Sequence, residues 1–313
     1  MIETVAAIDL AVDEKLIIKK NRLMPEVSNC NLKRICIVTG LHGDELEGQY
    51  VCYEVNRIIN ENKKYLKGIV DIYPTLNPLG IDCVHRGMPT FDLDMNRIFP
   101  GSENGAMAEY VAARIVDDIK DSDLCIDIHA SNIFLREAMQ VRVSFENKER
   151  LLPYAEKMNT DFIWIYDETK VGQSTFVYNL NKLNVPTLMI EMGVGMKITK
   201  EYGNRIVDGI FNLMKSEEIW NGPVKNVKDP KIATSSDVTC INSKTSGIFI
   251  PSVEHWNKIE KGEEIGRVID ALEGRVLEVI KSPCDGMIFT LREYPVIYEG
   301  TLIARIMGGG IHE

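Results

Sequence analysis

The spacing of apolar residues along the chain predicts strands that alternate with helices. Two runs rich in apolar residues, 34–40 and 123–130, predict buried strands. Apolar residues at helical spacing predict amphipathic helices at about 45–62 and at 108–120. The same patterns predict further strands at 69–76, 139–145, 161–167 and 186–193, and further helices at 175–183 and 200–218.

This alternation indicates an α/β fold for residues 1–225, which we expect to form the larger domain. Strands that are apolar throughout are buried on both faces, so we expect helices on both faces of the sheet. Helical connections join neighbouring strands of such folds in parallel. We therefore predict a mostly parallel, or mixed, sheet.

The pattern changes after Gly222. Two prolines within 223–236 indicate a linker, and short strands separated by glycine turns follow it. A weak internal repeat is present, in which 246–251 resembles 285–290 and 259–265 resembles 297–303. Two similar halves predict a second domain at 226–313, a small pseudo-symmetric all-β barrel or sandwich.

This second domain resembles the biotinyl/lipoyl-like barrel. Carriers of that fold display a modifiable lysine on the turn that joins the two halves. The corresponding segment here, 271–277, has no lysine at its tip. We therefore expect a structural or capping role, and not a carrier role.

Composition and charge narrow the class of protein. Hydrophobic residues make up 45% and charged residues 26%, as in ordinary soluble proteins. No apolar run approaches the roughly 20 residues of a membrane helix, and the first residues are acidic where an export signal would be basic. A net charge of −10 disfavours nucleic acid as a partner. Seven scattered cysteines, never spaced as CxxC, indicate reduced thiols in the cytoplasm and no cysteine zinc site.

The candidate chemistry begins with His42 and Glu45, at the junction of a predicted strand and helix. Three residues apart on a helical turn, an imidazole and a carboxylate share one face and can bind one ion. A hydrolytic zinc commonly has two histidines and one glutamate as ligands and keeps a position for water. His129 qualifies as the third ligand because it closes the strand at 123–130, and sites in α/β sheets form at carboxyl ends of strands.

The alternative is that the His-x-x-Glu spacing arises by chance, as such short motifs often do. The remaining histidines are poorer ligands. His85 has no partner at ligand spacing, His255 lies in a polar segment, and His312 belongs to a glycine-rich tail. With only five histidines in the chain, His42 and His129 are the best candidates.

Glu191 closes the predicted strand at 186–193. A carboxylate at that end can take a proton from water and deliver it to a departing amine. A solvent-facing acid at a strand end is the competing interpretation. Beside a zinc site we favour catalysis.

A carboxylate clamp is predicted from Asn96 and Arg97, side by side in one turn, and from Arg86 eleven residues before Arg97. Arginine binds carboxylates through two parallel N–H bonds, and an asparagine amide adds a donor. The alternative is a surface loop in which arginine pairs with Asp92 or Asp94.

Together these segments resemble the succinylglutamate desuccinylase/aspartoacylase family, relatives of the zinc carboxypeptidases. The family's HGxE segment is matched by residues 42–45. Its DLNR segment and following FPG are matched by 94–97, with Met95 for leucine, and by 99–101. His129 and Glu191 follow in the family's order, and a C-terminal β-domain completes the match over nearly the whole chain.

The resemblance implies one zinc ion held by His42, Glu45 and His129, with Glu191 as general acid and base. It also implies that Asn96 and Arg97 bind the substrate carboxylate and that Arg86 steadies the carbonyl oxygen. In such relatives the β-domain narrows the entrance to small substrates, and Arg292 or Tyr298 are candidates to contribute from it.

We therefore expect a zinc-dependent amidohydrolase that deacylates a small N-acylated amino acid or a related carboxylate-bearing amide. Two alternatives stay open. One is a metallocarboxypeptidase acting on short peptides, and the other is a zinc-scaffold binding protein without catalysis. We also expect a small-molecule partner, no membrane partner, and possible homo-oligomers.

Overall fold

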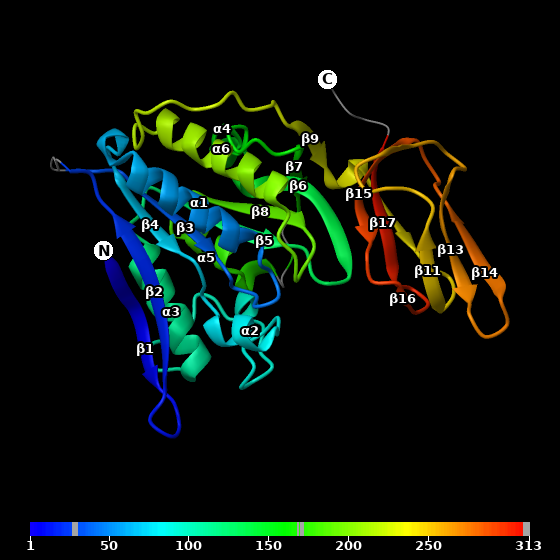
Figure 1. Cartoon of the computed structure of the whole chain (residues 1–313), viewed down its shortest axis with the longest axis horizontal. Coiled ribbons are helices and arrows are strands. Elements are labelled where there is room, and N and C mark those ends of the chain that lie inside the picture. The colour runs from blue at the N-terminus through cyan, green and yellow to red at the C-terminus, as the bar shows by residue number, and fades with distance from the viewer. Residues whose placement is uncertain (27–30, 168, 170–171, 309–313) are drawn as a thin grey trace.

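The structure is a computed structural model that describes residues 1–26, 31–167, 169 and 172–308. A long mixed sheet runs through most of the molecule, with the C-terminal β-region at one end and the N-terminal hairpin at the other (Figure 1). His312, which we rejected as a ligand, and Cys30 lie outside the described residues. No helix within the described ranges is both long and apolar enough to cross a membrane.

Parallel strands form the centre of the long sheet. They are, in spatial order, β4 (Ile69–Tyr73), β3 (Arg34–Thr39), β5 (Leu124–Ala130) and β8 (Thr187–Gly193). An antiparallel hairpin extends one edge of this centre, made of β2 (Lys15–Leu23) and β1 (Ile2–Asp9). On the other side, β6 (Leu135–Ser144) runs antiparallel to β8, and β7 (Phe162–Tyr166) runs parallel to β6.

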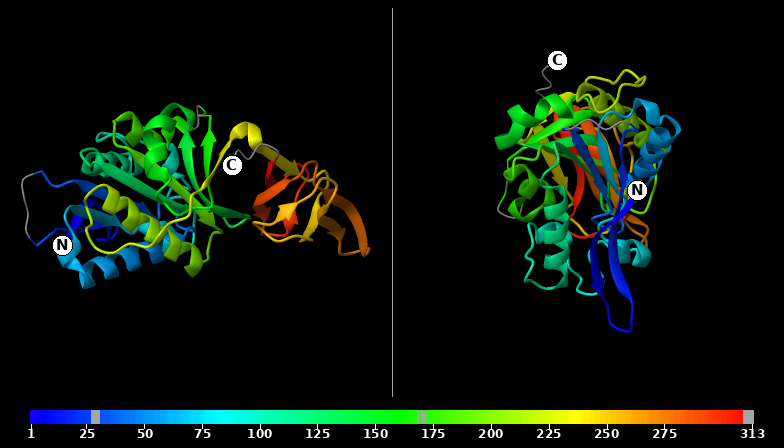
Figure 2. Two further views of the ribbon diagram at one scale, coloured as in Figure 1. Left: turned by 90° about the horizontal axis from the view of Figure 1, so that it is seen from above. Right: turned by 90° about the vertical axis from the view of Figure 1, so that its left-hand side faces the viewer.

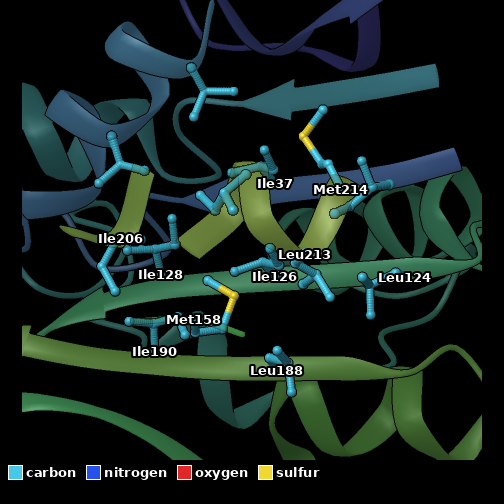
Figure 3. Packing of buried hydrophobic residues seen from close by; sticks show 14 of the residues in the cluster. Ile37, Leu124, Ile126, Ile128, Met158, Leu188, Ile190, Ile206, Leu213 and Met214 are labelled. Carbon is cyan, nitrogen blue, oxygen red and sulfur yellow. The ribbon is translucent and has the colours of Figure 1, made fainter. Parts of the chain in front are cut away.

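Helices cover both faces of the sheet, as the sequence predicts (Figure 2). One face carries α1 (Glu47–Glu61), α4 (Lys148–Ala155) and α6 (Lys200–Ser216), and the other carries α3 (Met107–Ile119) and α5 (Phe176–Lys182). Successive residues of β3 alternate between the two cores, with Ile37 in the first and Val38 in the second. Figure 3 shows Ile37 and its strand neighbours packed against the apolar side of α6.

The C-terminal β-region forms a sandwich. Its second sheet has the order β14 (Arg275–Lys281), β13 (Glu264–Asp270), β11 (Gly247–Pro251) and β16 (Val296–Ile297). The other layer continues the long sheet through β15 (Gly286–Arg292), β17 (Leu302–Gly308) and β10 (Val238–Asn242), with β12 (Lys258–Ile259) on β15. β15 pairs antiparallel with β6, so the sandwich is joined directly to the sheet that carries the helices.

The internal repeat has a structural counterpart. β11 and β12 of the first copy correspond to β15 and β16 of the second, and each copy's short strand pairs with the other copy's first strand. The two repeat glycines, Gly262 and Gly300, have left-handed φ angles of 89° and 82°. Both turns need a backbone conformation that side chains disfavour, which explains why glycine recurs there.

The sheet is mixed, one of the two predicted forms, because the hairpin β1–β2 and strand β6 are antiparallel to their neighbours. Other sequence predictions need correction. The first helix begins at Glu47 and not near Glu45, since the segment before it forms turns. The predicted linker contains β9 (Lys231–Thr234), which pairs in parallel with β7. The helices α2 (Pro78–Cys83) and α4 were not predicted.

Buried charges attach the N-terminal hairpin. Asp71 on β4 is fully buried and accepts hydrogen bonds from Arg22 of β2 at 2.7 and 2.8 Å. Arg34 donates to the same carboxylate at 2.8 Å, and the Lys20 ammonium lies 3.5 Å from it. The ion pairs of Arg22 and Lys20 with Asp71 link the hairpin to the central strands, in addition to the pairing of β2 with β4.

Candidate active site

The turn between β3 and α1 holds His42 and Glu45 in contact. The His42 Nδ1 lies 2.7 Å from Glu45 Oε1, and both side chains are buried. Gly43 permits this turn, because a Cβ at that position would lie 2.1 Å from the backbone carbon of Gly80. The predicted i, i+3 contact is therefore present, although it lies in a turn that precedes the helix.

His129 reaches the same carboxylate from β5. Its Nδ1 lies 2.9 Å from Glu45 Oε2, and its Nε2 lies 2.8 Å from Asp127 Oδ2. Asp127 is two residues before His129 on the strand, so their side chains share one face. Both carboxylates can only accept, so a proton on Nε2 bonds to Asp127, and the Nδ1 lone pair is then available to bind an ion that Glu45 also holds.

These three residues form a group able to hold a metal ion. One ligand atom from each of His42, Glu45 and His129 lies within 4.8 Å of the others. Lone pairs of an imidazole nitrogen and a carboxylate oxygen repel unless a proton or a cation lies between them. Tetrahedral zinc with bonds of about 2.1 Å separates its ligands by about 3.4 Å. The contacts of 2.7 and 2.9 Å need to open only slightly to accept the ion.

The predicted clamp residues lie beside this group. Arg86 donates to Glu45 Oε1 at 2.8 Å, and its second terminal nitrogen lies 3.1 Å from His42 Nε2. Asn96 accepts from the backbone N–H of Phe176 at 2.9 Å, which leaves its amide group as the donor for a ligand. The exposed Arg97 side chain donates to the carbonyl of Asn96 at 2.8 Å. Our alternative is a surface loop in which an arginine pairs with Asp92 or Asp94. Arg86 does approach Asp94, but its terminal nitrogen lies 3.8 Å from Asp94 Oδ2, which is a weak ion pair.

Glu191 lies in register with His129 on the neighbouring strand. Its Oε2 is 3.4 Å from a terminal nitrogen of Arg142 on β6. Burial raises the pKa of Glu191, and the nearby Glu45 raises it further, while Arg142 opposes both. A carboxyl group with a raised pKa, next to the candidate metal group, is suited to transfer protons near neutral pH.

One cavity of about 520 Å³ contains the site. Its lining includes every residue predicted for the metal, for catalysis and for the carboxylate clamp: His42, Glu45, Arg86, Asn96, Arg97, His129 and Glu191. The C-terminal region contributes Arg305 from β17 to the lining, and Ser235 contributes from the segment after β9. Arg292 and Tyr298, the two candidates from that region, do not line the cavity. Arg292 donates to the carbonyls of Tyr294 and Val296, and Tyr298 is 71% exposed.

Several residues of the site were missed. Asp127 could have been found from its i, i+2 spacing to His129 within one strand. Arg142 sits in an apolar run at 139–145, where a charged residue in a buried strand is itself a signal. Arg305 gave no such signal, because its place in the cavity depends on how the β-region joins β6.

Comparisons with known proteins agree with this architecture. A model of the succinylglutamate desuccinylase/aspartoacylase catalytic domain matches residues 31–216. The chain is 25% identical over 279 residues to N-alpha-acetyl-L-2,4-diaminobutyric acid deacetylase of Halomonas elongata, covering 85% of this chain and 80% of that protein.

Two solved structures illustrate the likeness in fold. A succinylglutamate desuccinylase/aspartoacylase from Rhodobacter sphaeroides matches with a TM-score of 0.82 at 20% identity, covering 98% of this chain and 95% of that one. The product-bound ectoine utilization protein EutE (DoeB) from Ruegeria pomeroyi matches with a TM-score of 0.82 at 16% identity, covering 97% and 93%. Both likenesses span the C-terminal β-region as well as the α/β part.

Proposed function

Because the chain belongs to the succinylglutamate desuccinylase/aspartoacylase family, we propose that it is a zinc-dependent deacylase of small N-acylated amino acids. The observation that carries the proposal is the meeting of His42, Glu45 and His129 in one cavity. The Halomonas relative, by its name a deacetylase of an acetylated amino acid, supports the same class of substrate.

In the proposed reaction, His42, Glu45 and His129 hold the ion, which supplies a positive charge that polarises the amide carbonyl and acidifies a water molecule. Glu191 takes a proton from the attacking water and returns it to the amine as the C–N bond breaks. Asn96 and Arg97 bind the carboxylate of the amino acid.

Arg86 has the least direct support for its role, the steadying of the developing negative charge on the carbonyl oxygen. Its guanidinium lies at the candidate metal group and in the cavity lining, which is where this role requires it. Arg86 donates to Glu45 in this structure, so when substrate binds it must either donate to both Glu45 and the carbonyl oxygen or leave Glu45 for the carbonyl oxygen.

The alternative peptidase activity requires room for a polypeptide. The C-terminal β-region adds Arg305 to the cavity wall, and the volume of about 520 Å³ matches a small molecule. These two features favour deacylation of amino acids over cleavage of peptides. The proposal also places the enzyme in the cytoplasm, which the six described and unpaired cysteines support.

The test begins with zinc content per chain and continues with hydrolysis by the zinc-loaded protein. N-acetyl, N-succinyl and aminoacyl derivatives of acidic and basic amino acids form the panel, together with dipeptides and tripeptides. We expect one zinc ion per chain and activity on acylated amino acids. The Glu191→Gln variant should keep its zinc and lose about 10²–10⁴-fold in kcat.

The matched control is Glu156→Gln, which alters an exposed carboxylate outside the cavity lining. It should behave as the wild type. Activity confined to peptides would replace the proposal with the peptidase. A wild type that binds zinc but hydrolyses nothing in the panel would leave only the binding-protein alternative.

A further inference from the structure

A second buried carboxylate, Glu137 on β6, lies behind the proposed catalytic residue. Its side chain is only 2% exposed, and it lines the cavity that contains the candidate site. Its Oε1 accepts from Arg305 at 2.8 Å and lies 3.5 Å from a terminal nitrogen of Arg142. Its Oε2 accepts from Gln140 at 2.9 Å and from Thr290 at 2.7 Å. None of these contacts is required by the reaction as proposed.

An irregularity in β6 brings Glu137 to this place. Side chains of a regular strand alternate between faces, so Glu137 and Gln140, three residues apart, should point to opposite sides. The pairing of β6 with β8 shifts register between these two residues. As a result Glu137 shares a face with Gln140 and Arg142. Such irregularities re-aim side chains and are frequent beside active sites.

Arg142 connects Glu137 with Glu191. Its guanidinium has one terminal nitrogen 3.5 Å from Glu137 and the other 3.4 Å from Glu191, so it spans the two carboxylates. It also lies over the Trp164 ring, 5.3 Å from the centroid, with Arg305 at 5.8 Å from the same ring. A planar guanidinium held by a carboxylate and an aromatic ring has little freedom to rotate.

The contacts of Glu137 cross the junction between the two parts of the chain. Thr290 and Arg305 belong to β15 and β17 of the C-terminal region, whereas Gln140 and Arg142 belong to β6. Burying an ionised carboxylate is costly unless it is paired and hydrogen-bonded, so the contacts of Glu137 tie both sides of the junction together.

We propose that Glu137 is a positioning residue: it fixes the Arg142 guanidinium, which in turn holds the Glu191 carboxylate in the orientation needed for proton transfer. This inference rests on the proposed deacylase function. It also gives the C-terminal β-region a part in catalysis, because Arg305 and Thr290 hold Glu137 in place.

The test compares kcat and KM of zinc-loaded variants on the best acylated amino acid of the panel. Displacement of a reacting group by about 1 Å can cost roughly 10²-fold in rate. Glu137→Gln keeps the shape of the side chain and removes its charge, and we expect kcat to fall about tenfold or more. KM should change less than about threefold, and zinc content should not change.

Arg142→Met should lower kcat by about 10²-fold, and Arg142→Lys, which keeps a positive charge, should recover part of that loss. If Glu137 acts through Arg142, the double variant Glu137→Gln/Arg142→Met should be no slower than Arg142→Met alone. Non-additive behaviour is the signature of residues in one network. The same cycle applied to urea unfolding should show coupling between the two positions, which is a readout independent of activity.

Glu293→Gln is the matched control. Glu293 also pairs with an arginine of β6, Arg136, at 3.0 Å across the same junction, but it lies outside the cavity lining. It should lose stability at most and keep kcat within about threefold of the wild type.

The inference is overturned if Glu137→Gln keeps wild-type kcat, if it resembles Glu293→Gln, or if the losses of Glu137→Gln and Arg142→Met multiply. If the Glu137 variant does not fold, full activity of Arg142→Met still overturns the inference. A wild type that hydrolyses nothing refutes the proposed function instead. In that case the unfolding measurements still test the inference, because additive unfolding free energies for Glu137→Gln and Arg142→Met would count against a network that joins the two residues.

Discussion

Replacing Asp127 by asparagine should weaken zinc binding without removing any ligand. Asp127 is fully buried and its Oδ2 accepts from His129 Nε2 at 2.8 Å. A carboxylate in this place fixes the imidazole tautomer and increases the basicity of the ligating nitrogen, and loss of such a partner costs about 10–100-fold in metal affinity. Asparagine keeps a neutral acceptor for His129, so we expect a loss of zinc affinity at the lower end of this range, about tenfold, which corresponds to about 1.4 kcal/mol.

The measurement is a competition titration in which the apo protein and a chromogenic chelator share zinc at constant pH. Stoichiometry should stay at one ion per chain while the dissociation constant rises. Thermal unfolding provides a second measure, because zinc that binds only the folded chain stabilises it according to its dissociation constant. The stabilisation by saturating zinc should therefore be about 1.4 kcal/mol smaller in the variant.

Asp123→Asn serves as the control, since Asp123 precedes the same strand and its side chain accepts from the backbone N–H of Arg34 at 2.7 Å. Its zinc affinity should match the wild type. An Asp127→Asn dissociation constant within twofold of the wild type, or an equal loss in both variants, would refute the assignment of Asp127 and His129 to one metal site.

Three further outcomes are expected. Asp71→Asn leaves three buried or half-buried cations underpaired, and urea unfolding at pH 7 should show a loss of about 3–5 kcal/mol. Burial alone would raise the pKa of Asp71, but its basic neighbours outweigh burial and lower it. The stability that Asp71 contributes is therefore present above its unfolded pKa of about 3.9 and is lost as the pH falls through the lower folded pKa. The difference in unfolding free energy between the variant and the wild type should shrink over the same pH range. Gly43→Ala places a Cβ 2.1 Å from the backbone of Gly80, so calorimetry should show a lower melting temperature and metal analysis a loss of zinc. Arg97→Lys removes the two-pronged donor, and steady-state kinetics should show KM raised about tenfold with a smaller effect on kcat; an unchanged KM would contradict its role at the substrate carboxylate.

The local pattern of the sequence was sufficient for the elements of the α/β core. The runs of apolar residues within 34–39 and 124–130 favour burial on both faces, which the centre of a covered sheet provides. The antiparallel hairpin β1–β2 and the helix α4 were not predicted from the sequence. Their formation depends on packing against β4 and α3 for the hairpin, and against β6 for the helix.

The sequence by itself determined the candidate ligand types and the strand ends near which they stand, because chemistry and strand periodicity are local properties. It selected His42, Glu45, His129 and Glu191 before any fold was known. Only the tertiary structure decided which more distant groups surround them. The register shift in β6 turns Glu137 toward Arg142, and the pairing of β15 with β6 carries Arg305 to the cavity. Strand register and the joining of the two parts arise from contacts between residues far apart in the chain, such as Glu137 with Gly193 and with Thr290, so no local pattern records them.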